Sequence, residues 1–131
     1  MSRAAAVPRR LMLVVEAGWI LDSPDFARLR AATERNEYFE IRLRGRRIAF
    51  EPSLPPNRCG MTLSDEGGFL LGPGAFLSEG ELRRTVLQEL FRLGLRDGGG
   101  SVDKRVARQH ALAARRFADW AYETACYLAL V

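Results

Sequence analysis

A single carboxylate, Glu89, is the residue whose position in this sequence most suggests chemistry. It follows Ser78 and Glu81, which are spaced as a capping box at the start of a helix. The inward face of that helix, at about 100° per residue, holds four apolar residues: Leu82, Val86, Leu90 and Leu93. Glu89 falls among them. Because a buried, ionised carboxylate is costly without a partner, we predict that Glu89 is buried beside a group that pairs with it.

His110, the only histidine of the chain, is the partner that the sequence offers. It lies on the apolar face of a second helix, expected over residues 102–128. The other residues of that face are Val106, Ala113, Ala114, Phe117, Ala121 and Leu128. The turn Asp97-Gly98-Gly99-Gly100 predicts that the two helices pack antiparallel, and a rise of about 1.5 Å per residue places Glu89 and His110 at similar heights.

A buried Glu89–His110 pair would hold a proton donor or acceptor near neutral pH, as general acid–base chemistry requires. The alternative is structural. In that case Glu89 bonds Thr85, Arg92 or a backbone amide, and His110 is an ordinary core histidine.

Gln88 and Arg92 flank Glu89 at the two positions where a His-Glu-x-x-His helix carries zinc-binding imidazoles. Both histidines are therefore missing. Cys59 and Cys126 are far apart and have no paired spacing, so they predict free thiols and not a zinc site. We predict no metal and no other cofactor. The candidate catalytic residues are Glu89, His110, Arg92 and Gln88.

Four arginines surround a predicted hairpin turn and are the candidate nucleic-acid-binding residues: Arg42, Arg44, Arg46 and Arg47. Tyr38 and Phe39 lie close to them in the sequence. Basic side chains beside aromatic rings hold single-stranded nucleic acid through phosphate pairing and base stacking. Hairpins are also commonly charged at the surface, so a solvated face is the alternative interpretation.

The expected elements give an α+β fold. Helices are predicted over residues 8–21, 24–36, 78–94 and 102–128, with Leu11, Val14, Val15 and Trp19 on the apolar side of the first. Alternation of apolar and polar residues over 38–50, around Gly45, predicts a hairpin, and residues 69–71 a short third strand. Residues 51–68 are expected to form a loop. The prediction is a small antiparallel sheet packed against helices, with a C-terminal antiparallel helical hairpin.

The length of 131 residues fits one domain, in which residues 1–22 form an N-terminal helix or linker and residues 23–131 the main body. With 47% hydrophobic and 27% charged residues, the composition is that of a globular protein. No apolar run approaches the roughly 18 residues needed to span a bilayer. A net charge of +4 permits weak attraction to nucleic acid.

The segment Gly72-Pro73-Gly74-Ala75-Phe76, which leads from a strand into the capped helix, resembles zincin-like C-terminal effector domains of bacterial polymorphic toxins. The similarity covers roughly residues 26–128. It implies that Glu89 matches the catalytic glutamate of that family, whereas Gln88 and Arg92 depart from the metal ligands. It also implies a larger secreted or phage-associated parent protein, a cognate immunity protein, and delivery to a target cell from the cytoplasm of the producing cell.

Two hypotheses follow from these residues. The chain is a toxin-type effector with a metal-independent or degenerate hydrolase site, in which Glu89 and His110 exchange protons and Arg92 stabilises negative charge. Alternatively, it is a non-enzymatic basic module that binds RNA or a partner protein. A third interpretation is that neighbouring segments of a longer protein supply the missing ligands.

Overall fold

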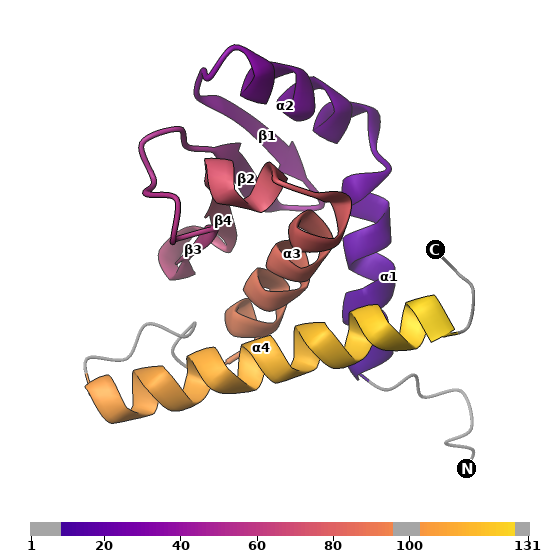
Figure 1. The fold of residues 1–131 in the computed structure, drawn as a ribbon, viewed down its shortest axis with the longest axis vertical. Coiled ribbons are helices and arrows are strands. Elements are labelled where there is room, and N and C mark those ends of the chain that lie inside the picture. Colours follow the sequence, from indigo (N-terminus) through magenta and orange to yellow (C-terminus); the bar gives the residue numbers. More distant parts are fainter. Residues whose placement is uncertain (1–8, 96–102, 128–131) are drawn as a thin grey trace.

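The computed structural model describes residues 9–95 and 103–127. It confirms the α+β class, with helices packed around a sheet (Figure 1). The helices are α1 (Arg9–Leu21), α2 (Pro24–Glu34), α3 (Glu79–Leu93) and α4 (Lys104–Tyr127). The strands are β1 (Phe39–Leu43), β2 (Arg46–Phe50), β3 (Gly60–Leu63) and β4 (Gly68–Leu71). Short 3-10 turns at Ser64–Glu66 and Pro73–Phe76 precede β4 and α3.

The sheet is mixed, in the order β1-β2-β4-β3. β1 and β2 form the predicted antiparallel hairpin, whose turn places Arg44 and Gly45 at φ angles of 51° and 81°. β4 runs parallel to β2, and β3 pairs antiparallel with β4 at the edge. The sheet is thus not wholly antiparallel, and its fourth strand, β3, lies in the segment expected to be a loop. Four residues among prolines and glycines carry too short an alternation to predict a strand.

The predicted starts of α2 and α3 are confirmed by side-chain caps. The Ser23 hydroxyl accepts a hydrogen bond from the amide of Phe26 at 3.1 Å. The Ser78 hydroxyl accepts one from the amide of Glu81 at 3.0 Å. Each bond satisfies an amide that has no partner within its own helix. The cap at Ser78 fixes where α3 begins and therefore which of its residues face inward.

The predicted inward face of α1 is wrong. Leu11, Val15 and Trp19 are exposed. The buried residues of α1 are Leu13, Ala17, Ile20 and Leu21. Because α1 is apolar around much of its circumference, the pattern alone does not select the face that packs against α3. Trp19 is instead covered by Arg44, whose guanidinium lies 3.9 Å from the centre of the ring.

Helix α3 lies between the sheet and α4 (Figure 1). On the sheet side the core is built around large, fully buried side chains: Phe26, Phe50, Phe69, Leu82 and Leu90. On the other side, Phe91 of α3 stacks on Phe117 of α4 with ring centres 5.1 Å apart. A side chain of α3 that points between these two contacts therefore faces the start of β3 and the loop before it.

Helix α4 returns antiparallel to α3, as predicted. Residues early in α3 meet residues late in α4: Arg84 lies 3.3 Å from Asp119, and Gly80 lies against the ring of Tyr122. The buried face of α4 includes Ala118 and not Ala113, which is exposed. The predicted glycine turn, the expected helix start at residue 102 and Leu128 lie outside the described residues.

Candidate functional site

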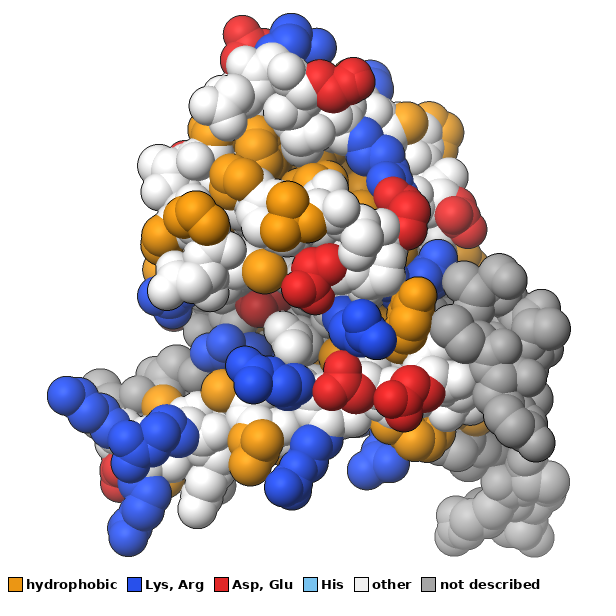
Figure 2. Space-filling view, in the orientation of Figure 1, with side chains coloured by type: hydrophobic (Ala, Val, Ile, Leu, Met, Phe, Trp, Pro, Cys, Tyr) orange, Lys and Arg blue, Asp and Glu red, His pale blue; other side chains and the backbone are white. Residues whose placement is uncertain are grey.

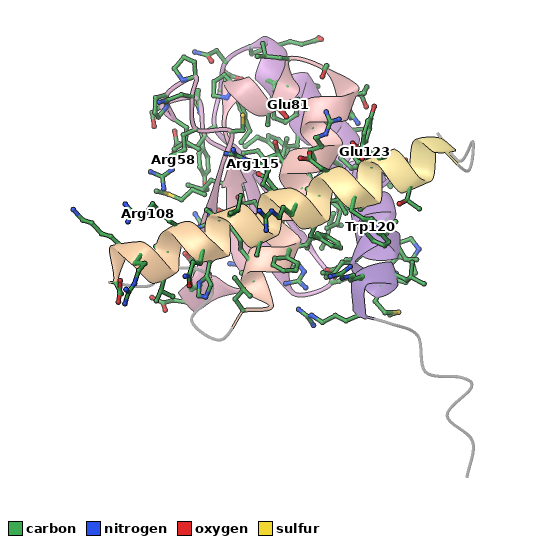
Figure 3. All side chains as sticks on the ribbon, turned by 60° about the horizontal axis from the view of Figure 1, so that its bottom comes forward. Arg58, Glu81, Arg108, Arg115, Trp120 and Glu123 are labelled. Atoms are coloured by element: carbon green, nitrogen blue, oxygen red, sulfur yellow. The ribbon has the colours of Figure 1, made fainter. Side chains whose placement is uncertain are left out.

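A cleft of about 380 Å³ opens between the loop before β3, helix α3 and helix α4. Its lining is mostly polar. Four arginines contribute to it: Arg58, Arg84, Arg92 and Arg115. Three acidic residues do so as well: Glu81, Glu89 and Asp119. Arg58 and Arg115 come from the loop and from α4, on the same side of the molecule (Figure 3).

Glu89 is buried, as predicted, with 2% of its surface exposed. The hydroxyl of Thr62, on β3, donates a hydrogen bond to Glu89 Oε1 at 2.6 Å. The other oxygen lies against the backbone of Gly60, where an added Cβ would be 2.9 Å from Glu89 Oε2. The carboxyl group is thus fixed between α3 and the start of β3, at the wall of the cleft.

Burial raises the pKa of the Glu89 carboxyl above its ordinary value. The hydrogen bond from Thr62 and the positive charges of Arg92 and Arg58 act in the opposite direction without cancelling the effect of burial. Glu89 therefore holds its proton more tightly than a solvated glutamate does. A group of this kind suits proton transfer nearer neutral pH.

The structure brings Glu89, Gln88 and Arg92 together at the cleft but places His110 elsewhere. His110 is neither one of the lining residues nor one of the groups that act on the Glu89 carboxyl. From α4 the cleft receives Ala111, Ala114 and Arg115. The expected contact between Glu89 and His110 rested on counting residues along two antiparallel helices. Such counting does not decide which way a side chain points, because each residue is turned by about 100° from the one before it.

The partner of Glu89 is Thr62, which sequence analysis did not identify. Thr62 lies on β3, the strand hidden in the predicted loop. In the sequence, β3 is indicated only by the alternation over Gly60-Met61-Thr62-Leu63. That pattern is too short to show that Thr62 lies beside Glu89, 27 positions away.

The arginines of the β1–β2 hairpin are largely engaged within the protein. Arg46 forms a bidentate ion pair with Glu16 of α1. Arg47 bonds Glu40 at 2.7 Å and Glu66 at 2.8 Å. Arg44 is exposed but stacks on Trp19, and Arg42, with 65% of its side chain exposed, lies 3.9 Å from Glu40. These contacts favour a structural role for most of the group over phosphate binding.

A different set of basic residues lies near the cleft and along the first half of α4. Lys and Arg side chains gather over the first half of α4, and acidic ones over its second half (Figure 2). Exposed arginines that form no ion pair within the described part of the chain include Arg58 at the cleft and four on α4: Arg105, Arg108, Arg115 and Arg116.

Cys59 is a free cysteine at the wall of the cleft. Burial and the negative charge of Glu81 raise the pKa of its thiol. Since the thiolate is the nucleophilic form, Cys59 is poorly suited to attack a substrate. The side chain of Cys126 lies outside the described residues.

The fold and site define an α+β domain with an acidic group set in an arginine-rimmed cleft. Comparisons with known protein families, with curated proteins and with solved structures gave no match. Among the described residues there is no group of three or more His, Cys, Asp or Glu side chains arranged to hold a metal ion. No helix within residues 9–95 or 103–127 combines the length and apolar character needed to cross a membrane.

The raised pKa of Glu89 predicts a pH-dependent stability. The folded protein binds this proton more tightly than the unfolded chain, whose carboxyl titrates near 4.5. Stability should therefore fall as pH rises from about 4.5 through the folded-state pKa. Glu89→Gln does not titrate and keeps an acceptor for Thr62, so its stability relative to the wild type should increase over that range by about 1.4 kcal/mol per unit of pKa difference.

Urea unfolding of both proteins between about pH 4.5 and pH 7.5 measures this change. Glu34→Gln, an exposed substitution on α2, is the matched control and should follow the wild type. A stability difference between Glu89→Gln and the wild type that is constant across the range would contradict the prediction.

Proposed function

We propose that this chain is a toxin-type effector domain whose cleft performs metal-independent acid–base hydrolysis. Glu89 donates and accepts the proton, and Arg92 with Arg58 stabilises negative charge that develops on the substrate. The observation that carries the proposal is a buried carboxyl group at the wall of a cleft, within the electrostatic reach of two guanidinium groups. His110 has no part in it, since it does not line the cleft.

The side chains suit this chemistry. A carboxyl whose pKa is raised by burial exchanges protons nearer neutral pH than a solvated one does, and such catalysis contributes about 10²–10⁴-fold to a rate. Fixed cations beside it stabilise a developing anion without reorganisation. Where the zincin-like family carries its two metal-binding histidines, this chain has Gln88 and Arg92. In the sequence, a positive charge therefore takes the place of one metal ligand.

The resemblance to polymorphic-toxin effectors adds the biological part of the proposal. The domain would act after delivery to a target cell as part of a larger parent protein. In the producing cell it would remain in the cytoplasm, neutralised by a cognate immunity protein. A protein that covers the cleft would need acidic side chains opposite Arg58 and Arg115.

Expression in a bacterial host tests the proposal. The wild-type chain should arrest growth, and Glu89→Gln should restore it, because the amide keeps the shape and the Thr62 contact but cannot transfer the proton. Circular dichroism and a urea midpoint establish that the variant is folded, and Glu34→Gln should remain as toxic as the wild type. A folded Glu89→Gln variant that still arrests growth, or a wild-type chain harmless in both cytoplasm and periplasm, contradicts the proposal.

The second candidate is a non-enzymatic module that binds RNA or a partner protein. It is favoured by Arg58 and Arg115, which are exposed at the cleft and form no ion pair with any residue that the structure describes. Binding that survives in Glu89→Gln, without turnover by the wild type, would support this candidate. If the double variant Arg44→Ala and Arg46→Ala loses that binding, the binding surface lies on the hairpin. If the double variant still binds, the surface lies elsewhere.

A further inference from the structure

The charge of α4 changes sign along its length. Its first part carries Lys104, Arg105, Arg108, Arg115 and Arg116, all exposed. Its second part carries Asp119 and Glu123. Figure 2 shows the same division on the surface, with blue side chains over the start of the helix and red ones beyond them. An elongated anion would therefore be attracted to one half of α4 and repelled from the other.

The basic half leads into the cleft. Lys104, Arg108, Ala111 and Arg115 follow the spacing i, i+4, i+7 and i+11, which places them on one stripe of the helix. Ala111 and Arg115, at the end of that stripe, line the cleft. Arg58 approaches from the loop before β3, and Arg58, Arg108 and Arg115 lie on the same side of the molecule (Figure 3). Basic side chains thus lie at intervals from the start of α4 to the cleft that Glu89 lines.

These cations are available to a ligand. Lys104, Arg108 and Arg115 form no ion pair within the described part of the chain, in contrast to Arg46 and Arg47 of the hairpin. Unpaired arginines bind phosphate by paired N–H donors and release counterions in doing so. The cleft of about 380 Å³ lies at the end of this stripe, lined by Ala111 and Arg115.

We propose, on the basis of the hydrolase function proposed above, that the substrate is single-stranded RNA. Its phosphates would lie along the stripe of Lys104, Arg108 and Arg115, and the phosphodiester to be cleaved would lie beside Glu89 between Arg58 and Arg92. RNA fits a site with one proton-transferring carboxyl because it carries its own nucleophile, the 2′-hydroxyl. DNA lacks that group and would need an activated water.

The reaction balances without a further reagent. The Glu89 carboxylate takes the proton of the 2′-hydroxyl, and the 2′ oxygen forms a bond to phosphorus. The bond from phosphorus to the 5′ oxygen breaks, and its electron pair leaves with that oxygen, which takes a proton from solvent. Glu89 then returns its proton to solvent. The products are a 2′,3′-cyclic phosphate and a free 5′-hydroxyl, and the arginines stabilise the charge on the phosphoryl oxygens.

The test incubates the full chain with an end-labelled single-stranded RNA of mixed sequence. The same sequence as DNA, as 2′-O-methyl RNA and as duplex RNA is assayed in parallel. Only the single-stranded RNA should be cleaved, to fragments ending in a cyclic phosphate. Glu89→Gln should cut about 10²–10⁴-fold more slowly while retaining affinity. Arg108→Gln, an exposed change that leaves folding intact, should weaken binding and reduce its salt slope by about one.

Arg28→Gln, on the exposed face of α2, should behave as the wild type. Cleavage of DNA or 2′-O-methyl RNA at the rate of RNA would overturn the assignment. Failure of the wild type to cleave any RNA would also overturn the assignment. If Glu89→Gln relieved growth arrest in that case, the hydrolase proposal would survive with another substrate. If Glu89→Gln neither relieved growth arrest nor slowed RNA cleavage, both proposals would fail.

Discussion

Gly68→Ala should prevent this protein from folding. An added Cβ at Gly68 would lie 1.8 Å from the carbonyl oxygen of Arg47, 2.7 Å from its carbonyl carbon and 2.9 Å from its amide nitrogen. These are backbone atoms, which cannot move aside as a flexible side chain would. Gly68 begins β4, whose next residue, Phe69, pairs with Ile48 of β2. The clash therefore separates the two central strands of the sheet.

We expect the free energy of unfolding to fall by more than about 4 kcal/mol, a loss that few domains of this size survive. Circular dichroism and urea unfolding measure it. The matched control is Gly18→Ala in α1, where an added Cβ meets nothing within 4 Å. That change should stabilise the protein by about 0.5–1 kcal/mol, since alanine favours the helix. A Gly68→Ala protein within about 1 kcal/mol of the wild type would show that β2 and β4 do not pair as described.

The features predicted correctly from the sequence are those that depend on nearby residues. Ser23 and Ser78 cap their helices through amides three positions away. The burial of Glu89 follows from its place among residues of the same helix. Helical periodicity carries this information over one or two turns, and no tertiary contact is needed to read it.

The features that were missed depend on residues far apart in the chain. Thr62 bonds Glu89 across 27 positions, and Arg46 pairs with Glu16 across 30. The parallel pairing of β2 and β4 likewise leaves no local pattern, since β3 lies between them in the sequence but outside them in the sheet. The same limit applies to His110, which does not line the cleft beside Glu89. A site assembled from three elements is therefore only partly predictable.

Phe117→Ala should cost the protein about 3–5 kcal/mol and remove one wall of the cleft. The side chain of Phe117 is 5% exposed and stacks on Phe91 of α3, which joins the two helices. Truncation leaves a cavity at this contact, and α4 loses its principal aromatic anchor. Because Ala111, Ala114 and Arg115 bring α4 to the cleft, a looser helix would separate the basic stripe from Glu89.

Urea unfolding gives the loss of stability, and amide hydrogen exchange locates it. Exchange should accelerate first in α4, while amides of the sheet remain protected. Leu112→Ala, at a residue of the same helix that is 47% exposed, is the matched control and should change stability by less than about 0.5 kcal/mol. Phe117→Leu, which keeps most of the volume, should cost less than about 1.5 kcal/mol. If Phe117→Ala were as stable as Leu112→Ala, α4 would not be held by this stack, and a cleft formed between α3 and α4 would lose its structural support.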